Sequence, residues 1–294
     1  MAGVTTLGSI FLPTLPPERL HSVVQAAEAA GLEELWLWED CFKESGITAM
    51  AAALAWTTRL RVGIGLLPVP MRNVATVAME AATLERLFPR RAVIGVGHGV
   101  LDWMGQIGAR AESPLTLLGE HLDALRGLLA GQRLTVEGRY VRLTDVALDW
   151  APPVAPAVLA GAEGPKTLSL VGAKADGVIL PGGTSPDRLR AAVARYRAGR
   201  EEAGRGEGGR VVVFVPMTFG AGAEERLAAN AERWGHPAYE DLGVAGPDAA
   251  AVAAGVARWA EAGADAVILQ PMDDDPEPET TVRFVAEEVR PLVP

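Results

Sequence analysis

The chain has 294 residues, of which 49% are hydrophobic and 5% aromatic, so mainly aliphatic side chains have to fill its core. Its formal net charge is −10 and it carries no block of Lys and Arg, which excludes nucleic-acid-binding classes that need a basic face. Its one cysteine, Cys41, excludes a disulfide framework or a cysteine-based zinc site within the chain.

The N-terminal stretch and the hydropathy pattern predict a soluble protein. The stretch MAGVTTLGSIFLPTLPPERL lacks a basic segment followed by a long apolar one, so no signal peptide is expected. No apolar run reaches the roughly 20 residues of a membrane span. We therefore expect a cytoplasmic protein that binds neither a membrane nor a nucleic acid.

Short β-like runs alternate with amphipathic helical segments along the chain. Strands are predicted at residues 5–11, 35–38, 60–66, 92–96, 157–160, 176–180, 211–215 and 264–269. Helices are predicted at residues 16–31, 47–56, 73–88, 113–129, 165–171, 186–203 and 279–289. Because parallel strands need helical crossovers, this alternation predicts a closed (β/α)8 barrel, the TIM barrel; an open doubly wound sheet is the alternative.

The alternation pauses between the fourth and fifth strands. A Ser-Pro pair caps the helix at 113–129, and Glu137-Gly138 between two β-like runs is a hairpin signal. The Pro-rich stretch WAPPVAPAV closes the segment. We therefore expect one domain over residues 1–294, with residues 101–156 as an insertion between strands four and five that acts as a lid.

In a barrel of this type the active site lies at the C-terminal ends of the strands. The predicted loops there are rich in glycine, which lets a ligand approach the main chain closely. The residues that follow strands two to five are Glu39-Asp40, Gly65-Leu66-Leu67, Gly97-His98-Gly99 and Gly161-Ala162-Glu163-Gly164.

Three of these loops have two interpretations each. Neighbouring strand residues point to opposite faces, so at most one of Glu39 and Asp40 faces a pocket, as an acid–base or ligand-binding group; the alternative is a helix cap or an ion pair. His98 either donates or moves a proton in the pocket or bonds a loop carbonyl. The loop at 161–166 either holds a phosphate at a helix start or is an ordinary turn.

No common catalytic motif is present in the sequence. The stretch GVGHG lacks the third glycine of a dinucleotide fingerprint because Val100 stands there, and neither a P-loop nor a G-x-S-x-G motif occurs. The four histidines have no ligand spacing and the run at 273–275 is typical of a solvated loop, so no metal site is expected. A pocket of backbone, glycine and acids favours chemistry carried by a cofactor.

Three stretches of the sequence carry a family resemblance when they are taken together. They are GLEELWLWED, AAALAWTTRLRVGIGLLPVPMRNVATVAMEAATLERLFPRRAVIGVGHG and VLAGAEGPKTLSLVGAKADGVIL. With them the chain resembles the luciferase-like monooxygenase superfamily over nearly its whole length, and within it the coenzyme F420-dependent oxidoreductases. The resemblance implies a (β/α)8 barrel with an insertion that shields the cofactor face.

The resemblance also implies a cofactor site. Glu39 and Asp40 fall where F420 enzymes of the family contact the ring system, often with Asp-His, so Asp40 replaces the usual histidine. A non-proline cis peptide at Gly65-Leu66, followed by Leu67, is expected to back the ring. The positions expected beside the cofactor or its phosphate are Gly97, His98, Gly161, Ala162, Glu163 and Gly164.

Catalytic and substrate-binding residues follow from the same positions. Asp40 and His98 are the catalytic candidates. The aromatic residues Phe11, Phe42 and Trp103 are the candidate substrate contacts. The sugar-phosphate branch of the family has a glutamate where Val100 stands, so a small, apolar substrate is expected instead.

The activity implied by the resemblance is hydride transfer between coenzyme F420 and an organic substrate, with a separate reductase regenerating the reduced cofactor; family members are often homodimers. The alternative is a two-component monooxygenase that uses reduced FMN and dioxygen. No arginine occurs between Gly95 and Ala109, where FMN enzymes of the superfamily often hold the phosphate, and this favours F420. Two hypotheses from other functional classes are a non-catalytic flavin-binding barrel and a cofactor-free lyase.

Overall fold

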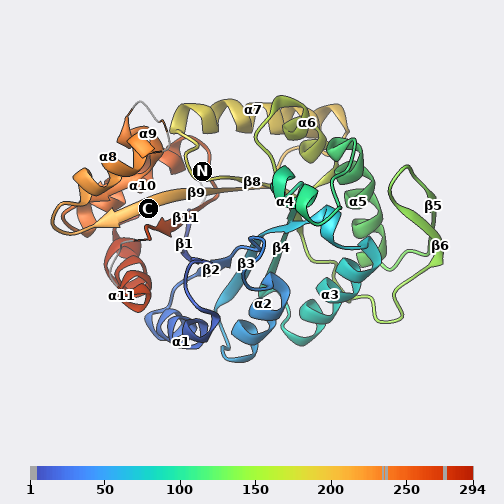
Figure 1. The fold of residues 1–294 in the computed structure, drawn as a ribbon, viewed down its shortest axis with the longest axis horizontal. Helices are drawn as coiled ribbons and strands as arrows, with labels where there is room; N and C mark the ends of the chain where they lie inside the picture. Colours follow the sequence, from blue (N-terminus) through green and yellow to red (C-terminus); the bar gives the residue numbers. More distant parts are fainter. Residues whose placement is uncertain (1–4, 234, 236–237, 274–276, 294) are drawn as a thin grey trace.

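The computed structural model describes residues 5–233, 235, 238–273 and 277–293. Parallel strands close into a barrel (Figure 1), in the order β9-β11-β1-β2-β3-β4-β7-β8, with β8 paired back onto β9. The strands are β1 (Thr6–Phe11), β2 (Glu34–Leu37), β3 (Arg61–Pro68), β4 (Ala92–Gly97), β7 (Val158–Gly161), β8 (Gly177–Leu180), β9 (Arg210–Phe219) and β11 (Ala266–Pro271). The predicted (β/α)8 barrel is confirmed.

Helices surround the barrel and connect its strands. They are α1 (Leu20–Ala30), α2 (Gly46–Ala55), α3 (Val74–Leu87), α4 (Leu101–Gln106), α5 (Pro114–Leu129), α6 (Pro165–Lys174), α7 (Pro186–Glu202), α8 (Ala223–Arg233), α9 (Tyr239–Leu242), α10 (Ala249–Glu261) and α11 (Pro278–Arg283). A π-helical turn, Phe284–Val289, follows α11. Among the described residues, none of the helices combines the length and the apolar character that crossing a membrane requires.

One strand is longer than the sequence predicts. β9 runs on to Phe219 although Pro216 indicates a strand end at residue 215. Pairing continues past the proline because β11 accompanies β9 as far as Met217, and the short strand β10 (Val244–Gly246) then pairs with its last residues. β9 therefore extends beyond the barrel rim.

Strand alternation divides the apolar side chains between two cores. On β4, Ile94 and Val96 pack toward the helices, whereas Val93 points into the barrel. The barrel interior is filled by Ile10, Leu12, Trp36, Val93, Leu159, Ile179, Val212, Phe214, Ala266 and Ile268, with Trp38 packed against them. The interior is thus a packed core, and free space begins only at the strand ends.

Glycines on the inner faces of β3 and β4 make room for the largest interior side chains. A Cβ on Gly63 would lie 2.4 Å from the ring of Trp36, and one on Gly95 would lie 2.4 Å from Cδ1 of Ile179. Atoms in a close-packed interior do not approach so closely, so each position requires a residue without a side chain. Gly63 on β3 and Gly95 on β4 are therefore needed for packing of the barrel interior.

A buried carboxylate closes the N-terminal end of the barrel. Glu34 accepts a hydrogen bond from Nε1 of Trp36 at 3.0 Å. It also pairs with Arg61 at 2.8 Å and with Arg210 at 2.7 Å. Because both cations and the indole satisfy it, the charge of Glu34 is compensated inside the protein.

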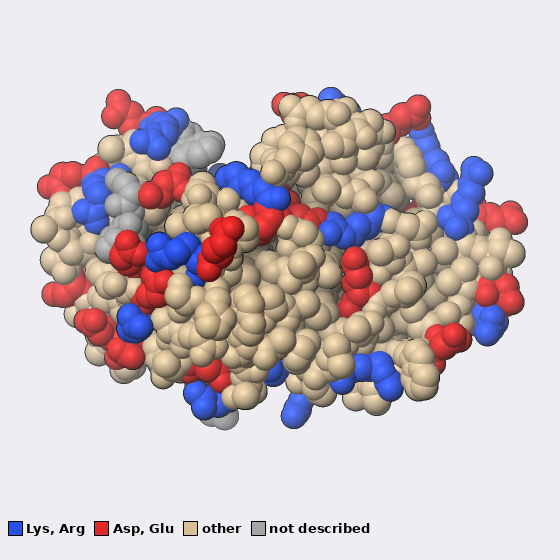
Figure 2. Space-filling model, turned by 60° about the horizontal axis from the view of Figure 1, so that its bottom comes forward, with Lys and Arg blue, Asp and Glu red and all other residues tan. Residues whose placement is uncertain are grey.

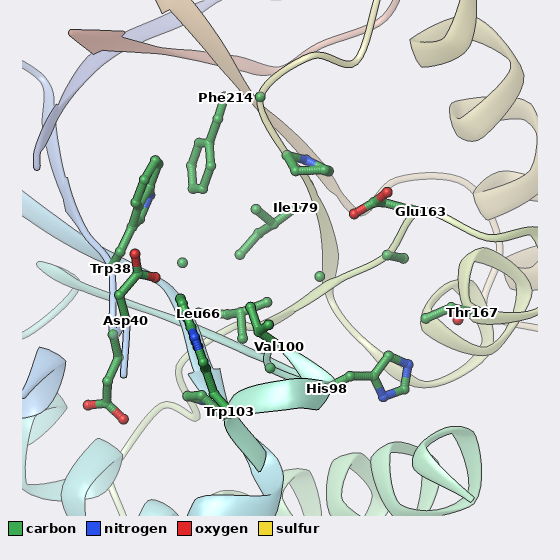
Figure 3. A pocket seen from close by; sticks show the side chains of 18 of the residues that line it. Trp38, Asp40, Leu66, His98, Val100, Trp103, Glu163, Thr167, Ile179 and Phe214 are labelled. Atoms are coloured by element: carbon green, nitrogen blue, oxygen red, sulfur yellow. The ribbon is translucent and has the colours of Figure 1, made fainter. Parts of the chain in front are cut away.

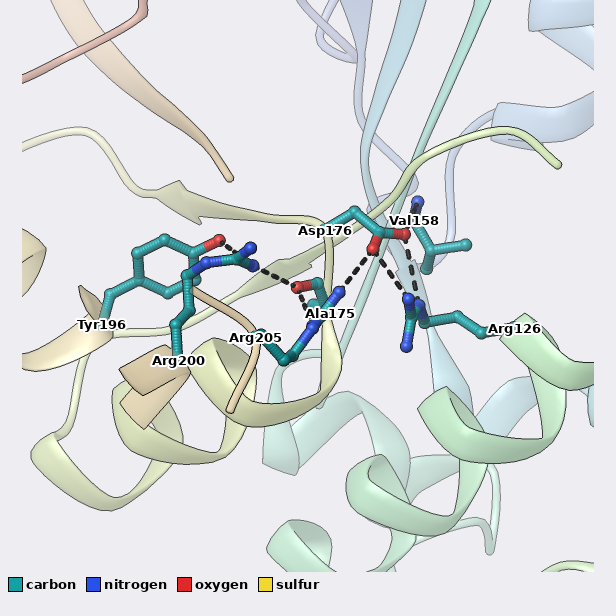
Figure 4. Close-up of polar contacts among 7 residues, drawn as sticks. All are labelled: Arg126, Val158, Ala175, Asp176, Tyr196, Arg200 and Arg205. Atoms are coloured by element: carbon teal, nitrogen blue, oxygen red, sulfur yellow. Dashed lines mark hydrogen bonds and ion pairs between the residues drawn. The ribbon is translucent and has the colours of Figure 1, made fainter. Parts of the chain in front are cut away.

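The segment between β4 and β7 is tied to the barrel wall by one carboxylate, shown in Figure 4. Asp176, directly before β8, accepts a hydrogen bond from the Val158 backbone at 3.1 Å. The same side chain pairs with Arg126 of α5 at 3.0 Å and with Arg205 of the α7–β9 loop at 2.7 Å. The expected hairpin of this segment is present as β5 (Leu134–Glu137) and β6 (Arg142–Val146).

Charged side chains of both signs are interleaved over the face shown in Figure 2. A notch opens at the upper edge of that face, between two lobes. No basic patch of the size that a nucleic acid needs gathers over the described residues of this face.

We predict that Gly63→Ala lowers the free energy of unfolding by about 1–3 kcal/mol, because overpacking against Trp36 forces the interior to move. Gly105→Ala in α4 is the control, since its Cβ would meet only Cδ of Arg110 at 4.0 Å. The control should be as stable as the parent protein or slightly more stable. Urea denaturation measures both; a Gly63→Ala protein as stable as the parent would contradict this packing.

Candidate functional site

A cavity of about 380 Å³ opens at the C-terminal ends of the barrel strands. The predicted site residues that line it are Glu39, Asp40, Gly65, Leu66, His98, Trp103, Gly161, Ala162, Glu163 and Gly164. Strand ends far apart in the sequence thus meet around one space. Figure 3 shows Trp38 and Asp40 on one side of it and His98 and Thr167 on the other.

The floor of the cavity is built around Leu66. The Gly65–Leu66 peptide is cis, which confirms the expected bond, and the pairing of β3 with β4 shifts register around it. A Cβ on Gly97 would lie 2.5 Å from Cδ2 of Leu66, and one on Gly161 would lie 2.4 Å from the same atom. The Leu66 side chain therefore lies across β4 and β7 in the room that these glycines leave, with its apolar surface toward the cavity.

Two expectations about this floor need correction. Gly97 does not line the cavity, because the Leu66 side chain lies over it. Leu67 does not line it either: it is buried in the core between strands and helices. Both residues support the floor from below or behind.

Glu39 and Asp40 both border the cavity, so the expectation that at most one of them faces it is wrong: β2 ends at Leu37, and regular strand alternation does not extend to the two acids. Glu39 accepts a hydrogen bond from the Gly46 backbone at 2.8 Å and forms a two-pronged ion pair with Arg72, whose Nη2 lies 2.8 Å from Oε2. Its carboxylate is therefore engaged in holding the β2–α2 loop to the segment before α3, although the residue borders the cavity.

Asp40 is partly buried and its carboxyl group is poorly solvated. Burial raises the pKa of its carboxyl group, and the charge of Lys43 partly offsets this rise. Among the described residues, no donor forms a hydrogen bond with this carboxylate, so nothing but Lys43 favours its charged form. A desolvated acid in a cleft is a common feature of functional sites.

His98 lies apart from Asp40, on the other side of the cavity (Figure 3). Burial lowers the pKa of its imidazole, and a hydrogen bond with the Pro114 backbone partly offsets that effect. The ring is therefore neutral near pH 7. The two residues expected to be catalytic do not form a pair, and His98 belongs to the end of the cavity beside α6.

The start of α6 forms that end of the cavity. Its N-cap is Gly164, so no side chain caps the helix, and Thr167 in the first turn lines the cavity. The backbone N–H groups of Lys166 and Thr167 have no partner within the helix and carry the positive end of its dipole. No Lys or Arg side chain is among the described residues that line this cavity, so an anion here would meet backbone donors.

Two of the three aromatic residues expected at the substrate do not reach the cavity. Phe11 is buried in the core outside the barrel, because strand alternation turns its neighbour Ile10 inward. Phe42 is 65% exposed and does not line this cavity or the second cavity described below. Trp103, at the start of α4, does line the cavity.

A second cavity, of about 790 Å³, adjoins the first. The two share Trp38, Asp40 and Trp103 as a common wall. Much of the other wall belongs to α8, a segment to which the sequence assigned no role. Asp40 therefore borders both spaces.

Several lining residues carried no clear signal in the sequence. Ile179 and Phe214 lie on β8 and β9 and line the first cavity as part of the interior core, and Thr167 lies in a helix. The first two could have been identified only by working out which alternate residues of each strand point into the barrel near its C-terminal end. Thr167 could have been found from its place in the first turn after a βα loop.

In the residues that the structure describes, no group of three or more His, Cys, Asp and Glu could hold a metal ion. His236 and residues 274 and 275, which the sequence interpretation assigned to no metal site, lie outside the described residues.

Comparison with known proteins places the chain in a family. Residues 4–277 match the luciferase-like monooxygenase family, so the chain belongs to it. A 5,10-methylenetetrahydromethanopterin reductase of Methanolobus tindarius is 29% identical over 201 residues, which are 68% of this chain and 61% of that protein. An F420-dependent hydroxymycolic acid dehydrogenase of Mycobacterium tuberculosis is 29% identical over 223 residues, 70% of this chain and 58% of that protein.

The barrel also matches a solved structure. The coenzyme F420-dependent tetrahydromethanopterin reductase of Methanopyrus kandleri superposes with a TM-score of 0.84 at 21% identity, covering 98% of this chain and 99% of that one. The structural match establishes the shared fold. The sequence matches span less than two thirds of the relatives' length, at 61% and 58%.

We predict that Asp40→Asn makes the protein more stable than the parent at pH 7. A carboxyl group whose pKa is raised on folding binds its proton more tightly in the folded state, so its ionisation costs stability as the pH rises through that pKa. The gain should vanish below about pH 3.9, the ordinary pKa of aspartate, where both states are protonated. Thermal unfolding from pH 3 to pH 8 measures the difference; a pH-independent difference would contradict the assignment.

Proposed function

We propose that the protein is a coenzyme F420-dependent oxidoreductase that transfers hydride between the deazaflavin and an organic substrate. Three findings support this: membership of the luciferase-like monooxygenase family, an F420-dependent dehydrogenase among its relatives, and a strand-end cavity with an apolar floor and the N-terminus of α6 at one end. The proposal rests chiefly on the third, because it concerns this chain's own residues.

The two ends of the cavity suit the two parts of such a cofactor. Leu66, Ile179 and Phe214 offer the apolar surface that a flat ring system needs. Backbone N–H groups at the start of α6, with the hydroxyl of Thr167, would hold the phosphate of the side chain. The residues that line the cavity therefore fit the group.

The charge at this end favours F420 over FMN. F420 has a phosphodiester with one negative charge, whereas FMN ends in a phosphate monoester with up to two. The described lining offers no cationic side chain and includes the acid Glu163. A helix N-terminus with about half a positive charge suits the singly charged ester better.

Each wall then has a role in the reaction. When bound, the deazaflavin supplies the hydride donor and acceptor. Asp40 can hold or release a proton where the two cavities meet, since its carboxylate is partly desolvated and has no hydrogen-bond donor among the described residues. Trp38 and Trp103 line the same junction and would shield a bound substrate from water. His98 stays neutral and belongs to the anion-binding end.

The proposal extends to the lid segment, the partner reductase and the oligomeric state. The segment at 101–156 acts as a lid within a single domain over residues 1–294, because α4 brings Trp103 over the cavity while Arg126 anchors α5 to Asp176. A separate reductase would regenerate the reduced cofactor, and the protein would act as a cytoplasmic homodimer.

We predict that coenzyme F420 binds saturably in a fluorescence-quenching titration and that FMN binds at least about tenfold more weakly, a difference of about 1.4 kcal/mol. Gly161→Ala should weaken F420 binding by about tenfold or more, because its Cβ displaces the flexible end of Leu66 upward into the cavity. Gly105→Ala in α4 is the control, since Gly105 lines neither cavity and its Cβ would meet only Cδ of Arg110 at 4.0 Å, and it should bind within about twofold of the parent.

Three outcomes would overturn the proposal. Saturable binding of FMN alone would favour the two-component monooxygenase. Binding of neither cofactor would favour a cofactor-free barrel enzyme. Tight F420 binding without hydride transfer to any member of a panel of aldehydes, ketones, imines and enones would favour a flavin-binding barrel without catalysis.

A further inference from the structure

The second cavity lies where a substrate would have to be if the first holds the cofactor. It adjoins the first along Trp38, Asp40 and Trp103, and with about 790 Å³ it is the larger of the two. An occupant would contact the same Asp40 that borders the cofactor space. This inference rests on the proposed function and adds a substrate class to it.

One wall of this cavity is apolar. Besides the two tryptophans, the residues that form it are Leu12 and Pro13 after β1, Pro216 within β9, and Pro271 and Met272 at the end of β11. These side chains favour a flat or aliphatic body. They account for the apolar substrate that the sequence predicts, but only for part of the cavity.

The facing wall is polar because α8 is amphipathic. Leu227 and Ala231, four residues apart, pack with Leu242 in a small core of their own. The opposite side of the helix carries Asn230 and Arg233 into the cavity wall. The cavity therefore has one apolar side and one hydrogen-bonding side, and a purely apolar substrate would leave the second without partners.

The three cationic side chains that line this cavity differ in the hydrogen bonds and charged neighbours that they have. Arg226 donates hydrogen bonds to the backbone oxygens of Phe219 and Ala221, both at 2.8 Å, so it braces the β9–α8 loop. Lys43 lies near enough to Asp40 to lower the pKa of that carboxyl group. Arg233 forms no hydrogen bond or ion pair with any residue in the described ranges.

Among the described residues, none of the acids that line this cavity pairs with Arg233. Asp273 accepts a hydrogen bond from Thr14 at 3.1 Å. Glu225 lies eight residues from Arg233 on α8, which is about 12 Å along a helix. Asp40 belongs to the wall shared with the first cavity. The guanidinium of Arg233 is therefore the cation best placed to receive a ligand's charge.

We propose that the second cavity binds an amphiphilic substrate whose flat, apolar body lies against Trp38 and Trp103 and whose oxyanion, a carboxylate or a phosphate, pairs with Arg233. The planar fork of arginine matches either oxyanion. The reacting carbon of the substrate lies at the apolar end, beside Asp40, and the charged group selects the substrate without taking part in the reaction.

The test compares three probes that share one ring system: 2-naphthylacetate, 2-naphthyl phosphate and the neutral 2-naphthylacetamide. Isothermal titration should show that the parent protein binds at least one of the anions about fivefold more tightly than the amide, which corresponds to an exposed charge pair. The anion that binds more tightly identifies the oxyanion. Arg233→Gln should abolish the preference and leave the affinity for the amide unchanged.

Arg195→Gln is the control, because Arg195 is an exposed arginine on the outer helix α7 and lines neither cavity. It should keep the preference. The inference is wrong if the parent protein binds none of the probes, binds all three alike, or keeps its preference in Arg233→Gln.

F420 quenching on the same samples separates the two proposals. F420 binding without an anion preference would remove the substrate inference alone. An anion preference that depends on Arg233, in a protein that does not bind F420, would remove the proposed cofactor and leave an anion-selective cavity.

Discussion

The site depends on large apolar side chains that lie across glycines of neighbouring strands. Leu66 occupies the room left by Gly97 and Gly161, and Ile179 occupies that left by Gly95. Without these glycines the side chains would be pushed up into the cavity, and its floor would no longer be flat. The cis peptide before Leu66 lies at the same place, where β3 shifts its register against β4. The glycines thus shape the cavity indirectly, through the residues they accommodate.

A second constraint is the difference in surroundings between the two adjacent acids that follow β2. Glu39 is satisfied by Arg72 and the Gly46 backbone, whereas Asp40 is left at the junction of two cavities. Burying a carboxylate without donors costs stability. That cost is explained if Asp40 serves the reaction, and position separates it from His98, which lies on the other side of the cavity near Thr167.

The barrel could be predicted from the sequence because its signals are local. Eight apolar runs separated by helical segments require parallel strands, and the cis Gly65–Leu66 peptide followed from the resemblance to a family. Side-chain direction was harder to predict. Phe11 ends its strand on the helix side and Phe42 lies on the surface, because a shift of one residue reverses the face. That α8 lines the second cavity could not be predicted, since it depends on how the helix packs at the end of the barrel.

The central claim is that the Leu66 floor and the start of α6 together hold a deazaflavin, with Asp40 at the reactive end. A crystal structure of the protein with coenzyme F420 tests it most directly. The account predicts a ring packed on Leu66, a phosphodiester at the backbone of Lys166 and Thr167, and Asp40 beside the edge of the ring. A ring bound in the cavity lined by α8, or a phosphate held away from α6, would contradict it.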